Sequence, residues 1–114
     1  MLIKTFLEKL TNTPQTLEFT DTMAVIEENY LFTEIGFVNG EQHNVAGQNS
    51  GSCKLFAFAL LQNLSPAQTL ACFGQYYRED VLHYPQGDDH QNIRQFMING
   101  WDGIHFTTPA LTEK

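Results

Sequence analysis

The order of apolar and polar positions predicts two amphipathic helices before residue 31. In residues 3–10 the apolar side chains recur at the spacing of one helical face, and lysine and glutamate side chains occupy the other side. A proline at position 14 follows a capping threonine. The helical pattern resumes there through an acidic stretch to Tyr30, with an interruption near Thr20.

The helical period is lost between residues 32 and 45, where a turn or a small hairpin is expected. Asn39-Gly40 is the strongest two-residue hairpin signal in the chain. Side chains of alternating character precede it from Thr33 to Phe37, and the arm that follows it, residues 41–45, is nearly all polar.

The segment from Cys53 to Leu61 is apolar around most of a helical circumference. Soluble domains tolerate such a helix only when other elements cover every face. A polar, glycine-rich loop precedes it at residues 47–52, and Asn49 or Ser50 is expected to cap its start. We therefore expect this helix to be central.

The best-supported helix start is Ser65-Pro66-Ala67-Gln68, which combines a capping serine, a proline at the first helical position and a glutamine that completes a capping box. An apolar stripe over residues 70–81 continues this helix. The helix is expected to stop before Pro85.

The last part of the chain contains one more predicted helix, which begins at a capping box of Asp88 and Gln91, carries Ile93, Phe96 and Met97 on its buried side and ends at Asn99-Gly100. The apolar alternation over residues 101–106 is expected to pack on, or pair with, the region of Phe37. The tail after Pro109 is expected to be mobile.

Together these elements predict a single compact domain over residues 1–114. Its class is mainly α, with about five helices packed around the central apolar helix, and a small hairpin would make it α+β. The length is that of one domain, and no internal repeat, low-complexity tract or linker divides the chain.

The charge balance disfavours two classes of partner. Thirteen acidic residues against six basic ones give a formal net charge of −7, whose field repels nucleic acids and anionic lipids.

The longest apolar run, residues 55–61, is far shorter than the roughly 20 residues needed to cross a bilayer. We expect a protein or a small molecule as partner, and no nucleic acid or membrane.

Two cysteines are too few for a disulfide scaffold or a four-cysteine zinc site, so a reducing, cytoplasmic compartment is expected. Side chains that ligate first-row metals gather around one turn at His83, Asp88, Asp89 and His90. Their spacing lacks the one-turn histidine pair of a helical metal site, and Asp88 is already assigned to capping. We predict no metal site and no cofactor.

Four separated blocks carry a family resemblance: residues 19–26 (FTDTMAVI), 46–59 (AGQNSGSCKLFAFA), 73–82 (FGQYYREDVL), and 89–94 (DHQNIR) running into 100–103 (GWDG). In this order they resemble the HopJ type III effector protein family, also called HopPmaJ-like. The resemblance covers nearly the whole chain, implies a bacterial protein and brings no catalytic residues. The family name implies secretion into a host, whereas the ordered helix predicted at the N-terminus favours the bacterial cytoplasm.

Cys53 is the residue with the most reactive chemistry. A thiol at a helix N-terminus feels the positive end of the helix dipole, which lowers its pKa. The Gly-Ser-Cys string around it is similar to that of papain-like thiol hydrolases. His90 or His105 would then be the base, and Asp102 or Asn92 would orient it. We favour the alternative, a buried structural thiol at the start of a core helix, because that role is more common.

The leading functional interpretation is a small acidic binding module of unknown molecular activity. Two polar segments, residues 39–52 and 83–90, are its expected binding surface. The candidate ligand-binding residues are Asn39, His43, Gln48, Asn49, His83 and Arg94. A hydrolase that uses Cys53, His90 and Asp102 is the alternative, so the sequence leaves open whether the protein is an enzyme.

Overall fold

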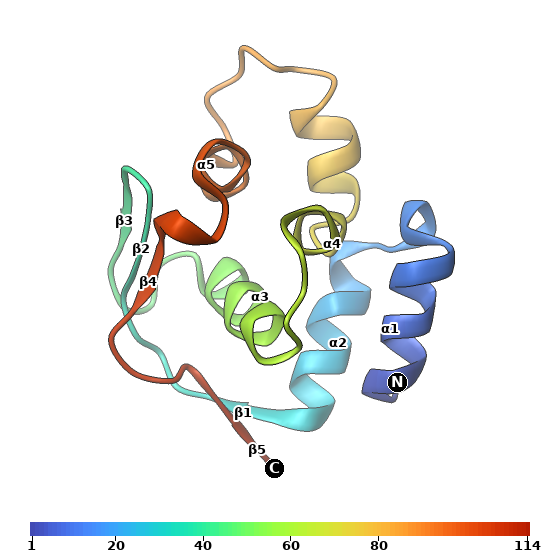
Figure 1. Cartoon of the computed structure of the whole chain (residues 1–114). Helices are drawn as coiled ribbons and strands as arrows, with labels where there is room; N and C mark the ends of the chain where they lie inside the picture. The colour runs from blue at the N-terminus through green and yellow to red at the C-terminus, as the bar shows by residue number, and fades with distance from the viewer.

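Helix α3 (Ser50–Leu61) lies in the middle of the molecule, and the other elements pack around it (Figure 1). The structure is a computed structural model that describes all residues from 1 to 114. Phe56 and Phe58 are completely buried, as the all-round apolar pattern predicts, whereas Leu60 is 45% exposed. The prediction of a central helix is therefore confirmed for all but its last turn.

Four further helices surround α3. They are α1 (Ile3–Asn12), α2 (Phe19–Asn29), α4 (Pro66–Ala71) and α5 (Gln91–Asn99). Short 3-10 turns follow α1 and α5, namely η1 (Pro14–Thr16) and η3 (Gly100–Gly103), and a π-helical segment, η2 (Tyr76–Val81), lies between α4 and α5. None of the helices combines the length and the apolar character that crossing a membrane requires.

The strands form two small antiparallel sheets: in Figure 1 the three-stranded sheet lies on the opposite side of α3 from α1, and the two-stranded sheet lies below α3. One pairs β1 (Tyr30–Phe32) with β5 (Leu111–Glu113); the other has the order β3 (Gln42–Asn44), β2 (Phe37–Asn39), β4 (Ile104–Phe106). The predicted hairpin is confirmed, with Gly40 at a left-handed φ of 59°. The predicted pairing near Phe37 is also confirmed, because Phe37 is the register partner of Phe106.

The prediction of a mobile tail after Pro109 is wrong. Strand β5 pairs with β1, and the backbone nitrogen of Thr33 donates to the carbonyl oxygen of Ala110 at 2.8 Å. Ala110 and Leu111 are buried. The tail is therefore held both by a strand ladder and by its contribution to the core.

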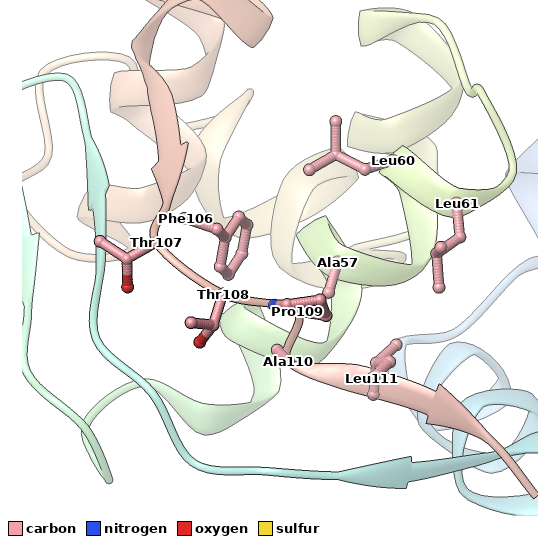
Figure 2. Close-up of a pocket in the computed structure, with 9 residues that line it drawn as sticks. All are labelled: Ala57, Leu60, Leu61, Phe106, Thr107, Thr108, Pro109, Ala110 and Leu111. Atoms are coloured by element: carbon pink, nitrogen blue, oxygen red, sulfur yellow. The ribbon is translucent and has the colours of Figure 1, made fainter.

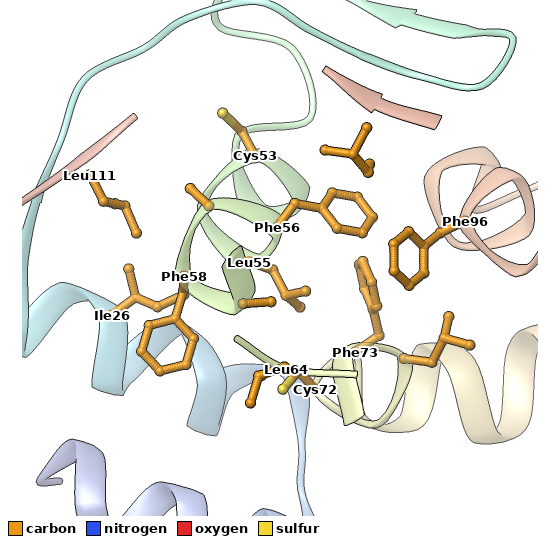
Figure 3. Packing of buried hydrophobic residues seen from close by; sticks show 14 of the residues in the cluster. Ile26, Cys53, Leu55, Phe56, Phe58, Leu64, Cys72, Phe73, Phe96 and Leu111 are labelled. Atoms are coloured by element: carbon orange, nitrogen blue, oxygen red, sulfur yellow. The ribbon is translucent and has the colours of Figure 1, made fainter. Parts of the chain in front are cut away.

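A single core of 23 buried residues joins the helices to the sheets (Figure 3). At its centre the ring of Phe56 meets those of Phe73, Phe96 and Trp101 at centroid distances of 5.5, 5.1 and 6.2 Å. Such tilted and edge-to-face contacts are the favoured geometry of aromatic pairs. The fold is therefore helix-rich and α+β, which matches the α+β alternative more closely than a mainly α class.

The helix expected to run on through residues 70–81 is interrupted at Gly74, and the prediction of one continuous helix is wrong. Gly74 has a φ of +61°, and a Cβ at this position would lie 2.5 Å from the backbone nitrogen of Phe19. Glycine is therefore required both by the dihedral angle and by the close approach of two backbones. After this turn the chain winds into η2.

Two other helix starts differ from their predictions. Helix α5 begins after His90, whose φ is +49°, and not at an Asp88 cap; the backbone oxygen of Asp88 instead accepts from Gln91 Nε2 at 2.9 Å. Helix α2 begins at Phe19, because residues 17–18 are extended after η1. The interruption therefore falls before Thr20.

The capping box at the start of α4 is confirmed. The Gln68 backbone nitrogen donates to Ser65 Oγ at 3.2 Å, and the Ser65 backbone nitrogen donates to Gln68 Oε1 at 3.0 Å. Ser65→Ala is expected to lower the free energy of unfolding by about 1 kcal/mol, whereas Ser65→Gly costs only about a few tenths. Urea denaturation measures both, and an unchanged midpoint in Ser65→Ala would contradict a stabilising role for the cap.

Candidate functional site

A polar cleft of about 430 Å³ opens where the first turns of α3 and α5 meet η2 and the β2–β3 hairpin. Its polar lining comes from separate segments of the chain. The polar residues are Gln42, Asn49, Ser52, His90, Gln91 and Asn92. The cleft therefore takes residues from both polar segments, 39–52 and 83–90, that the sequence indicates as a binding surface.

Both helices that border the cleft begin after a residue in the left-handed conformation. The φ angles are +53° at Asn49, before α3, and +49° at His90, before α5. Neither side chain caps its helix. The backbone N–H groups of Ser52, Gln91 and Asn92 consequently have no acceptor within the chain and are available to a ligand.

A buried asparagine fixes the orientation of the amide side chains along the cleft. Asn44 is only 4% exposed, and its Oδ1 accepts from Asn49 Nδ2 at 2.7 Å and from Asn92 Nδ2 at 3.0 Å. Gln42 Nε2 donates to the same oxygen at 3.4 Å. Because all three amides turn their nitrogens toward Asn44, the carbonyl oxygens of Gln42 and Asn49 remain without a donor from the protein.

Asn39, one of the candidate ligand-binding residues, lies behind this network. Its side chain is completely buried, and Nδ2 donates to the backbone oxygen of Asn92 at 2.7 Å and to Asn92 Oδ1 at 3.1 Å. Asn39 therefore ties strand β2 to the start of α5 and does not line the cleft.

Aromatic rings form one wall of the cleft. Tyr76 lies 5.1 Å from Phe19 between ring centroids, and Phe19 stacks on Phe73 at 6.2 Å. The imidazole of His90 stacks on Tyr76 at 5.2 Å with an interplanar angle of 26°. The site thus combines polar groups with an apolar face, as small-molecule sites usually do.

His90 is held in place by an acidic partner. Its Nε2 lies 3.1 Å from Asp80 Oδ2 on η2. A carboxylate only accepts hydrogen bonds, so Nε2 carries the proton and donates. Nδ1 has no hydrogen-bond partner in the protein.

The three residues of the hydrolase alternative are not joined by any hydrogen bond or ion pair. Cys53 is 1% exposed, and its Sγ contacts the backbone oxygen of Ile35 at 3.8 Å (Figure 3). Burial raises the pKa of this thiol to about 11, against an ordinary value of 9.0. Asp102 is exposed on η3 without an ion-pair partner, and His90 bonds to Asp80.

The other candidate residues are dispersed. His43, Gln48 and His83 are exposed and lie outside the cleft. Arg94 lines a different hollow beside Pro85, where its guanidinium binds Asp89 Oδ1 at 2.6 Å and the backbone oxygen of Tyr84 at 2.9 Å. This hydrogen bond from Arg94 lowers the pKa of Asp89.

A second hollow, of about 350 Å³, is an apolar groove between the end of α3 and the segment that links β4 to β5 (Figure 2). Leu60, Leu61, Phe106 and Pro109 are among its lining residues, and none of the lining side chains is titratable. The groove therefore offers contact area but no acid–base or nucleophilic chemistry.

Sequence reasoning named Asn49 and His90 but did not single out Gln42, Ser52 or Tyr76. Single polar residues in a loop or in the first turn of a helix carry no signal that distinguishes a ligand contact from ordinary solvation. Only the folded chain shows that these positions meet.

Comparison with known proteins identifies the family of the chain. The sequence model of the HopJ type III effector protein family matches residues 3–111, so the chain belongs to that family, as its four blocks indicate. A solved structure described as "Crystal structure of unknown function protein VPA0580" is 56% identical in sequence, with a TM-score of 0.98. The match covers 100% of this chain and 95% of that one. A search of curated proteins finds no match.

Proposed function

We propose that this HopJ-family protein is a binding module that takes a small polar ligand into the cleft between α3 and α5. The observation that carries the proposal is the composition of the cleft: amide, hydroxyl, imidazole and backbone N–H groups face an aromatic wall in a hollow of about 430 Å³. This volume lies within the range of roughly 300–1,000 Å³ typical of small-molecule sites.

The geometry favours binding over catalysis. Ser52 is the only hydroxyl-bearing aliphatic residue of the cleft lining, and it makes no hydrogen bond with His90, so it lacks an activating base. Cys53 is buried away from the lining, and its raised pKa keeps the thiol neutral. The polar groups can orient a ligand without an activated nucleophile beside it.

A cleft-filling substitution tests the proposal. Ser52→Leu places an apolar side chain in the cleft, whereas Ser50→Leu changes a neighbour on the same helix that does not line it. In a screen of small polar compounds by ¹⁵N NMR, those that shift the N–H signals of the cleft are expected to bind Ser52→Leu at least about tenfold more weakly.

The matched variant gives the control. Ser50→Leu is expected to bind the same compounds as tightly as the parent protein. If Ser52→Leu retains full affinity, or if no compound shifts the cleft signals, the cleft is not the binding site and the proposal fails.

We place this binding in the bacterial cytoplasm. Both cysteines, Cys53 and Cys72, are free and buried, which suits a reducing compartment. The family name, in contrast, refers to secreted effectors. Recovery of the protein from the culture medium of the bacterium that naturally produces it would contradict a cytoplasmic site of action.

A further inference from the structure

We propose that the ligand of the cleft is an uncharged, hydroxyl-bearing ring, with a neutral monosaccharide as its chemical type; this inference rests on the proposed function. It follows from three properties of the lining: its lack of formal charge, the amide oxygens and N–H donors it leaves free, and its aromatic wall.

The first property is charge. No lysine, arginine, aspartate or glutamate lines the cleft. Two charged side chains close in sequence to lining residues are already paired, because Arg94 binds Asp89 and Asp80 binds His90. A cation would lose its hydration without gaining an acidic partner, and an anion would gain only N–H groups at the two helix starts and no basic side chain, so ionic ligands are poorly compensated. The net charge of −7 further disfavours an anion.

The second property is the mixture of acceptors and donors. The network centred on Asn44 leaves the side-chain oxygens of Gln42 and Asn49 free, and Gln91 Oε1 is free because its nitrogen donates to Asp88. These oxygens only accept hydrogen bonds. An ionised carboxylate or phosphate also only accepts hydrogen bonds, so it could not pair with these oxygens and its negative charge would be repelled by them.

A hydroxyl group suits this mixture because it both donates and accepts. It can donate to the free oxygens of Gln42 and Asn49, and it can accept from the backbone N–H groups of Ser52 and Gln91. A ring that carries several hydroxyls on its edge therefore satisfies both sets of groups at once.

The third property is the wall formed by Phe19 and Tyr76. One face of a monosaccharide ring presents C–H groups, and packing it on aromatic rings removes apolar surface from water. The hydroxyls at the ring edge then point toward the amides and helix starts on the other sides of the cleft.

The experiment compares neutral sugars with a charged one. Glucose, galactose, mannose and ribose are titrated into the full ¹⁵N-labelled chain, with glucuronate as the charged counterpart of glucose. At least one neutral sugar is expected to shift the N–H signals of Ser52 and Gln91 to saturation, and glucuronate is expected to bind at least about tenfold more weakly.

A pair of asparagine variants locates the contact. Asn49→Gly removes the amide without strain, because glycine adopts the φ of +53° freely. It is expected to weaken sugar binding about tenfold. Asn63 also has a left-handed φ, of +55°, but lies outside the cleft, so Asn63→Gly is expected to leave the affinity unchanged.

The outcomes separate this inference from the function on which it rests. If no neutral sugar binds while other compounds of the screen shift the cleft signals and lose affinity in Ser52→Leu, the ligand class is wrong and the binding function stands. Equal binding of glucuronate and glucose, or equal losses in Asn49→Gly and Asn63→Gly, would also overturn the inference. If nothing shifts the cleft signals, both proposals fail.

Discussion

Replacing Phe56 by alanine is expected to lower the free energy of unfolding by about 3 to 5 kcal/mol. The side chain is completely buried at the centre of the core, where its ring meets Phe73, Phe96 and Trp101. Truncation removes these contacts and leaves a cavity that the close-packed core around Phe56 cannot close. Because domains are stable by only about 5–15 kcal/mol, the variant should be marginally folded.

Urea denaturation, followed by the fluorescence of Trp101, measures this loss. Trp101 is the only tryptophan, and its ring lies 6.2 Å from that of Phe56, so its emission reports on the same part of the core. Phe32→Ala is the matched control: Phe32 is half-buried on β1, and its loss is expected to cost about 1 kcal/mol. A loss below about 1 kcal/mol in Phe56→Ala would contradict the central position of α3.

The same packing also supports the cleft. Phe73, which contacts Phe56 in the core, lines the cleft with its other neighbour, Phe19. Helix α5 is held by Phe96, whose ring meets both Phe56 and Trp101. The core thus fixes the relative position of the two helix starts that border the cleft.

The elements that were predictable are those whose signal is local. The capping box at Ser65 and Gln68 lies within four residues, and the hairpin depends on a turn for which Gly40 is well suited. The burial of α3 up to its last turn follows from its apolar pattern, since a helix that is apolar on most of its circumference is covered by other elements. Each of these depends on side chains close together in sequence.

The features that were missed depend on distant partners. The break at Gly74 arises because the backbone of Phe19 approaches it, and no pattern near residue 74 shows this contact. Strand β5 is ordered by β1, which lies far away in sequence. An aspartate cap at Asp88 is chemically reasonable, but α5 begins after His90, whose imidazole contacts Asp80 and Tyr76.

The cleft was only partly predictable for the same reason. The two polar segments were identifiable as surface, and Asn49 and His90 belong to them. The role of Asn44 as the acceptor for three amides could not be seen, because Asn92 and Asn49 reach it from different helices. Composition indicates which groups are available, whereas their convergence is a property of the tertiary structure.

Cys53 and Cys72 are expected to resist alkylation in the folded protein. Burial raises the pKa of Cys53 to about 11 and that of Cys72 to about 12, from an ordinary value of 9.0. Since each pKa unit is a factor of about ten, the reactive thiolate at neutral pH is reduced roughly 100-fold for Cys53 and roughly 1,000-fold for Cys72. Poor access to the two sulfur atoms slows the reaction further.

The pKa shifts also set the sign of a pH effect. The pKa values of both thiols are higher in the folded state than in the unfolded chain, so the folded state favours the neutral, protonated thiols. The stability that this contributes is complete below about pH 9 and is lost as the pH rises through the folded values of about 11 and about 12. Thiolate formation therefore requires alkaline conditions or unfolding.

Labelling with iodoacetamide at neutral pH, followed by measurement of the intact mass, tests this expectation. The same experiment tests the hydrolase alternative. Neither thiol should gain a label until urea unfolds the chain, and both should then react at the rate of a free cysteine. Cys72 serves as an internal control, because it lies at the end of α4, with no helix N-terminus to favour its thiolate. Rapid labelling of Cys53 alone in the folded protein, slowed by His90→Ala, would show an activated thiol and would favour catalysis at this helix start over binding at the cleft.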